Sequence, residues 1–158
     1  EELQALAAAQ INFSVVPGIT AATGSAAYAG IPLTHRDHAQ SVTFVTGHTQ
    51  DGGREPDWRS LALPGATIVF YMGLGRLDRI VEKLQEHGAP GTRPAGILAQ
   101  GTTADQRVIT ATLATIRGAS TDAKLESPAL LVVGEVVALR PTLAWFGTAA
   151  EVDLSKSA

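Results

Sequence analysis

Hydrophobic and polar positions along the chain predict strands that alternate with helices. The near-continuous apolar run Ala66–Met72 is typical of a strand that is buried on both faces. The clearest helix follows it, because apolar residues between Leu77 and Leu84 recur at the i, i+3, i+4, i+7 spacing of one helix face. Gly88 then stands where a helix end favours glycine.

The same reading assigns the other elements. Four more segments are predicted as strands: Ser41–Thr46, Pro94–Ala99, Arg107–Leu113 and Ala129–Val133. A short strand is also expected at Phe13–Val16, and helices at Glu1–Gln10, at Ile19–Ala29 and from Asp57. This alternation predicts an α/β fold with a mixed sheet of about five strands flanked by helices. The small polar residues of 147–158 predict a disordered tail, which leaves residues 1–146 as the folded unit.

Composition narrows the class of protein. With 158 residues, of which 45% are hydrophobic, one globular domain with its own core is expected. The formal net charge of −3 gives no basic footprint for nucleic acid, and no apolar run approaches the roughly 20 residues of a membrane span. The absence of Cys excludes a disulfide scaffold and fits a reducing cytoplasm.

Three small-residue turns are the candidate binding elements. They are Thr20-Ala21 after Pro17-Gly18, the segment Met72–Gly75, and Gly101–Thr103. Ligands of open α/β sheets bind outside the carboxyl ends of the strands, so we expect the three turns to meet at one pocket. The alternative is that these glycines only form turns.

Several common binding and catalytic motifs do not match the sequence. A dinucleotide fingerprint at Met72–Arg76 lacks its third glycine, because Asp78 stands there. His35 and His38 match no common zinc spacing, and no Cys completes a site, so no metal is expected. Neither a phosphate-binding P-loop nor a serine-hydrolase elbow occurs.

Arg36 is the sharper candidate within the polar cluster Thr34–His38. Its guanidinium can hold a carboxylate through two parallel hydrogen bonds. The alternative is a salt bridge to Asp37 or another nearby acid.

Five further segments occur along the chain in this order: VVPGITAATG, GIPLTHRD, VTGH, FYMGL and QGTTADQRV. Together they resemble the tetrapyrrole methylase family, and within it the uroporphyrinogen-III C-methyltransferases, including the module of that type in sirohaem synthase. The likeness continues through SPALLVVGEVVALR to Trp145-Phe146, so it covers nearly the whole chain.

The resemblance implies methyl transfer from S-adenosyl-L-methionine to ring carbons of uroporphyrinogen III, which gives precorrin-2, by an enzyme that is usually a homodimer. Thr20 and Ala21 match the family's cofactor-binding pair, Met72 matches the methionine at the adenosyl group, and Gly101 matches the glycine on the adenine side. Arg36 matches the anchor for substrate carboxylates, assisted by His35. No catalytic residue is assigned.

The family's glycine-rich opening loop and its Gly-Asp-Pro segment do not occur in the sequence. The resemblance therefore implies a C-terminal subdomain that, alone, binds the cofactor weakly and turns nothing over. Three alternatives stay open: a methylase of a later precorrin, a non-catalytic fragment for dimerisation and ligand holding, and an RNA or protein methylase of the same fold.

Overall fold

The structure is a computed structural model that describes residues 1–47, 53 and 55–147. His48 and all of the predicted tail except Gly147 lie outside the described residues. None of the helices in those described ranges is long and apolar enough to cross a membrane.

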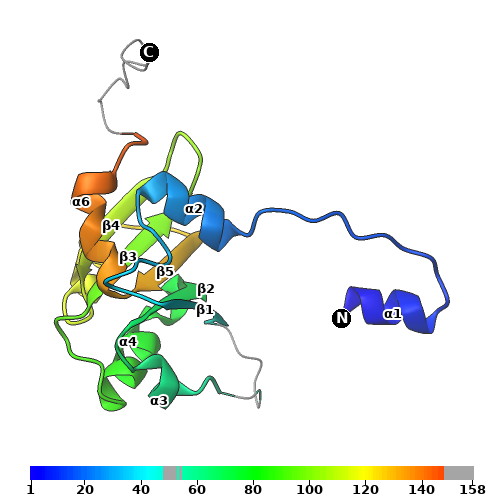
Figure 1. The fold of residues 1–158 in the computed structure, drawn as a ribbon, viewed down its shortest axis with the longest axis horizontal. Helices are drawn as coiled ribbons and strands as arrows, with labels where there is room; N and C mark the ends of the chain where they lie inside the picture. Colours follow the sequence, from blue (N-terminus) through cyan, green and yellow to red (C-terminus); the bar gives the residue numbers. More distant parts are fainter. Residues whose placement is uncertain (48–52, 54, 148–158) are drawn as a thin grey trace, which may run out of the picture.

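A five-stranded mixed sheet forms the centre of the molecule, as the alternating pattern predicts (Figure 1). Its strands are β1 (Ser41–Thr46), β2 (Ala66–Tyr71), β3 (Pro94–Ala99), β4 (Arg107–Thr112) and β5 (Ala129–Val133), in the order β1-β2-β5-β3-β4. β1 runs parallel to β2, and β5 runs antiparallel to both β2 and β3. β1, β2 and β3 therefore point the same way, and their carboxyl ends lie along one edge, which we call the carboxyl edge.

Helices cover both faces of this sheet (Figure 1). One face packs against α2 (Ala21–Ala29) and the 3₁₀ helix η2 (Glu135–Leu139), which leads into α6 (Arg140–Leu143). The other face packs against α3 (Trp58–Leu61), α4 (Leu77–Glu86) and α5 (Ile116–Asp122), and the 3₁₀ helix η1 (Leu74–Arg76) leads into α4. The result is a three-layer α/β arrangement.

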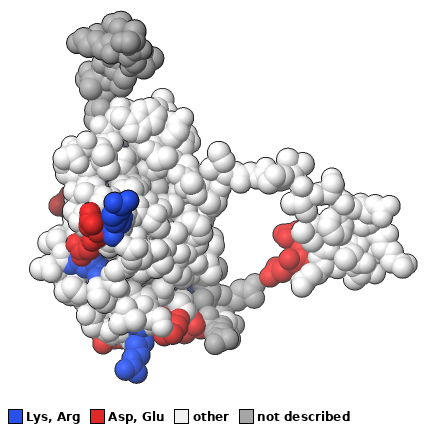
Figure 2. Space-filling view, viewed as in Figure 1, with Lys and Arg blue, Asp and Glu red and all other residues white. Residues whose placement is uncertain are grey.

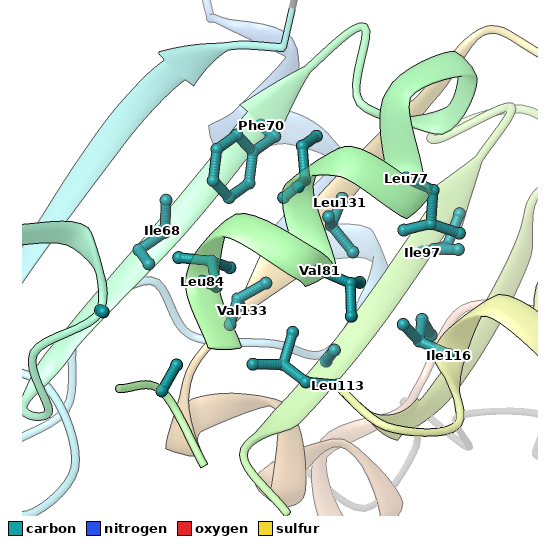
Figure 3. Close-up of a cluster of buried hydrophobic side chains, with 14 of the residues drawn as sticks. Ile68, Phe70, Leu77, Val81, Leu84, Ile97, Leu113, Ile116, Leu131 and Val133 are labelled. Carbon is teal, nitrogen blue, oxygen red and sulfur yellow. The ribbon is translucent and has the colours of Figure 1, made fainter. Parts of the chain in front are cut away.

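Alternation along the central strands supplies both cores. In β2, Ile68 and Phe70 face the α4 side whereas Val69 faces the α2 side, and all three are almost fully buried. Figure 3 shows Phe70 and Ile68 beside Leu84 of α4. A strand buried on both faces needs this continuous apolar sequence, which is why the run Ala66–Met72 predicts β2 so well.

The N-terminal segment corrects one expectation. α1 (Glu2–Ala8) lies away from the sheet and is joined to α2 by an extended stretch (Figure 1). The predicted strand Phe13–Val16 is wrong, since residues 11–20 carry no strand pairing within the described part of the chain. Phe13 and Val15 are exposed there. An apolar β-like sequence forms a strand only when a neighbouring strand accepts its hydrogen bonds.

Candidate functional site

Unusual backbone conformations gather at the carboxyl edge. Met72, directly after β2, has a φ of 54°, and Gln100 and Thr102, directly after β3, have φ of 51° and 70°. Residues other than glycine seldom adopt positive φ, and such positions concentrate at functional sites. The carboxyl edge is therefore the candidate location of a binding site.

The amino end of α2 is tied to this edge by Tyr71. The Tyr71 hydroxyl, at the end of β2, accepts a hydrogen bond from the Ala22 backbone N–H at 3.1 Å and makes a second one with the Thr20 hydroxyl. Thr20 is the N-cap residue of α2, but its own side chain makes no capping bond. The phenol of Tyr71 satisfies an N–H of the first turn instead, and it fixes Thr20 beside the strand that leads into Met72.

Gly101 lies in close contact with α2. A Cβ atom at this position would fall 2.6 Å from the Cβ of Ser25 and still closer to the Ser25 hydroxyl. Any side chain at residue 101 would therefore push α2 away from the loop after β3. This close approach is a reason for glycine that has nothing to do with forming a turn.

Two cavities share Ala21, Ser25 and Gly101 in their walls. The larger, of about 390 Å³, is lined by Ile19, Thr20, Ala21, Gly24, Ser25, Tyr28, Gly101 and Thr102. The smaller, of about 160 Å³, is lined by Ala21, Ser25, Leu98, Gln100, Gly101, Thr103 and Pro128. All of these lining residues are uncharged, and Figure 2 shows the surface over α2 without Lys, Arg, Asp or Glu.

The structure brings three of the four expected cofactor residues into one cavity. Thr20, Ala21 and Gly101 line the larger cavity together. Met72 does not line it; it stands at the same edge, next to Tyr71, with 61% of its surface exposed. Two of the three small-residue turns therefore share a cavity, whereas the turn Met72–Gly75 lies at the same edge without lining it, so the expectation of one pocket for all three is met only in part.

Arg36 and His35 lie elsewhere. They belong to a tight turn between α2 and β1, in which His35 and Ala39 form an isolated bridge. The Gln40 backbone N–H donates to the carbonyl of Gly65 at 3.0 Å, just before β1 and β2 begin. The turn is therefore at the edge of the sheet opposite the cavities.

Within this turn Arg36 is exposed, and its backbone carbonyl accepts a hydrogen bond from the Gln40 side chain. The alternative salt bridge to Asp37 does not occur among the described residues. The Asp37 backbone N–H donates to His35 Nδ1 at 3.1 Å, and the rings of His35 and His38 lie 4.7 Å apart. The cationic side chain of Arg36 is free to meet an anion from solvent.

Sequence reasoning missed Tyr71, Ser25 and Tyr28. Ser25 follows Ala21 by four positions, so the two residues share one face of the helix. This spacing could have identified Ser25 once Ala21 was assigned to the cofactor. The hydrogen bonds of Tyr71 were not predictable, because they join residues 49 and 51 positions apart.

Comparison with known proteins gives one family. The tetrapyrrole (corrin/porphyrin) methylases match residues 1–117. Siroheme synthase 2 of Aeromonas hydrophila is 58% identical over 147 residues, which are 93% of this chain and 31% of that protein. Siroheme synthase of Stutzerimonas stutzeri is 58% identical over 146 residues, again 31% of that protein. The chain spans about a third of the length of the curated relatives it matches.

Solved structures agree with this family. A uroporphyrin-III C-methyltransferase from Thermus thermophilus superposes with a TM-score of 0.73 at 38% identity, over 90% of this chain and 60% of that one. A uroporphyrin-III C-methyltransferase from the same organism, complexed with S-adenyl homocysteine, gives a TM-score of 0.72 at 33% identity, over 87% of this chain and 59% of that one. A cobalt precorrin-4 methyltransferase, at 19% identity and a TM-score of 0.75, shares the fold alone.

Proposed function

The chain belongs to the tetrapyrrole methylase family, and from that premise we propose that it forms part of an S-adenosyl-L-methionine-dependent C-methyltransferase that converts uroporphyrinogen III to precorrin-2. The observation that carries the proposal is the uncharged cavity at the carboxyl edge, which collects Thr20, Ala21 and Gly101 from segments 80 positions apart in the chain. The Thermus enzyme crystallised with S-adenyl homocysteine supports the choice of cofactor.

The cavity fits part of such a cofactor. Small-molecule sites are concave and mostly apolar with a few polar groups, and they usually have volumes of about 300–1,000 Å³. Here the lining residues are mostly small or apolar, and the polar side chains among them carry hydroxyl groups. We assign Thr20, Ala21 and Gly101 to the cofactor, with Met72 as a further contact at the rim of the same edge.

The proposed methyl transfer needs few charged side chains. When bound, the cofactor supplies a methyl group on a sulfonium, which an electron-rich ring carbon can accept without a metal. The residues of this chain bind and orient, and orientation is itself a large part of a rate enhancement. Tyr71 keeps Thr20 in place, and the contact of Gly101 with Ser25 fixes the distance between α2 and the loop after β3. We assign no residue of this chain as the base.

Arg36 and His35 remain our candidates for substrate carboxylates. The exposed guanidinium and its lack of an ion pair in the described residues support this role. We propose that they hold the substrate from the opposite edge of the sheet, apart from the cofactor cavity. A homodimer and a cytoplasmic location complete the proposal.

An assay of the full-length natural protein tests the proposed reaction. The protein is incubated with uroporphyrinogen III and S-adenosyl-L-methionine, and the absorbance of the precorrin-2 chromophore is followed. We expect the chromophore to accumulate only when both compounds are present. Methyl transfer to a later precorrin and none to uroporphyrinogen III would contradict the proposal in favour of its alternative. Light scattering of the same sample tests the dimer.

A further inference from the structure

We propose that the Ser25 hydroxyl is a hydrogen-bonding contact for the nucleoside part of the methyl donor. This inference rests on the proposed function and adds a residue to it. Ser25 lies on the second turn of α2 and lines both the larger and the smaller cavity. A ligand that extends from one cavity into the other passes its side chain.

Ser25 is a largely buried residue whose hydroxyl has no partner among the described residues. Only 7% of its surface is exposed, and within the described part of the chain its hydroxyl makes no hydrogen bond. The hydroxyl is not one of the fully enclosed polar atoms of the described residues, so it stays open to the cavities that Ser25 lines. A ligand in those cavities can therefore reach it and make the hydrogen bond that the described chain does not supply.

The local helix gives no competing explanation. A serine inside a helix often donates to the carbonyl four residues earlier, which here belongs to Ala21. No such bond forms in the described structure, and the Ser25 side chain instead packs against Gly101. The absence of a Cβ at residue 101 is what leaves room for the hydroxyl between the two cavities.

The walls of the cavities indicate which part of the donor they receive. The lining carries no charged side chain, and its apolar members include Ile19, Tyr28 and Leu98. The amino-acid end of the donor bears charged groups, which bind best where opposite charges or several polar groups meet them. The nucleoside is neutral, with a flat apolar ring system and polar edges that a hydroxyl can serve. The chemistry of the lining therefore matches the nucleoside.

Replacing Ser25 by alanine tests the inference. Ser25→Ala removes only the hydroxyl, and alanine suits the helix. In the full-length natural protein we expect the dissociation constant for S-adenosylhomocysteine, measured by calorimetry, to rise roughly three- to tenfold, as the loss of one neutral hydrogen bond implies.

Ser120→Ala is the matched control. Ser120 is also a helical serine, on α5, with 8% of its surface exposed, and it lines neither cavity. We expect this variant to bind S-adenosylhomocysteine as the wild type does. Equal affinity of Ser25→Ala and the wild type would overturn the inference, whereas a wild type that binds no S-adenosylhomocysteine would overturn the proposed function itself.

Steady-state kinetics separate a ligand contact from a structural role. If Ser25 contacts the donor, Ser25→Ala raises the KM for S-adenosyl-L-methionine and leaves the KM for uroporphyrinogen III unchanged. A rise in both KM values together with a fall in kcat would mean that the hydroxyl serves the fold, which contradicts the inference.

Discussion

Individual residues at the carboxyl edge contribute mainly through close contacts between distant segments of the chain. Gly101 matters because the loop after β3 meets α2 at Ser25, and Tyr71 matters because one phenol oxygen reaches both Thr20 and Ala22. Each of these contacts joins segments that are far apart in the sequence. The family resemblance predicts Thr20, Ala21 and Gly101 as cofactor residues, but the contacts that hold them are visible only in the fold.

Replacing Arg36 tests its proposed role as an anchor for substrate carboxylates. Because it lies at the opposite edge from the cavities, Arg36→Ala should leave the affinity for S-adenosylhomocysteine unchanged. The kcat/KM for uroporphyrinogen III should fall about ten- to a hundredfold, as expected when a hydrogen bond to a charged group is lost. Calorimetry and steady-state kinetics on the full-length natural protein measure the two quantities.

The control for this variant is Arg59→Ala, which removes another exposed arginine, on α3. We expect it to leave both quantities as they are in the wild type. If Arg36→Ala weakened cofactor and substrate binding equally, its role would be structural and the substrate assignment would be wrong.

At the scale of elements, α3 shows how a short helix is held by its cap. Asp57 is the N-cap residue, and its carboxylate accepts a hydrogen bond from the Ser60 hydroxyl at 2.6 Å and one from the Ser60 backbone N–H at 3.2 Å. The bond from the Ser60 side chain, followed by the one from its backbone, lowers the pKa of Asp57 below its ordinary value of 3.8. The helix begins at Trp58, which packs in the core against Phe70.

This cap predicts a pH dependence of stability. A carboxyl whose pKa is lower in the folded state stabilises the fold above its unfolded pKa, and that contribution disappears as the pH falls through the folded value. Asp57→Ala should therefore lower the free energy of unfolding at pH 7, and the difference from the wild type should shrink below about pH 4. Urea unfolding at a series of pH values measures this.

Asp122→Ala provides the comparison, since Asp122 is an exposed carboxylate at the end of α5 that makes no hydrogen bond through its side chain in the described structure. We expect its effect to stay constant over the same pH range. A constant difference for Asp57→Ala as well would show that the charge of the cap does not contribute.

Elements were predictable where burial imposes a continuous apolar run, as in β3 and β5, or an apolar stripe, as in α4. The bounds of β3 and β5 agree with the sequence prediction because both strands are buried and apolar almost throughout. α5 escaped prediction because only Ile116 and Ser120 are buried, which gives no apolar stripe to detect. The strand at Phe13–Val16 was predicted wrongly, because its pattern lacks a partner in the described structure.

At the scale of the whole molecule, the sheet separates two sets of candidate residues. The carboxyl edge carries the cavities and the positive-φ residues after β2 and β3, whereas the turn with Arg36 lies at the other edge. Alternating strands and helices predict an α/β sheet, which the structure has, and the rule for ligand sites predicts the edge at which the two cavities lie. The position of Arg36 was not predictable, because it depends on the path of the chain from α2 back across the sheet.

We propose that the carboxyl edge binds the adenosyl part of the methyl donor. A crystal structure of the full-length natural protein with S-adenosylhomocysteine would show where the nucleoside lies. We expect it in the cavities beside Ser25, in contact with Thr20, Ala21 and Gly101 and with Met72 at the rim. A nucleoside bound away from these residues, with the cavities empty, would contradict it.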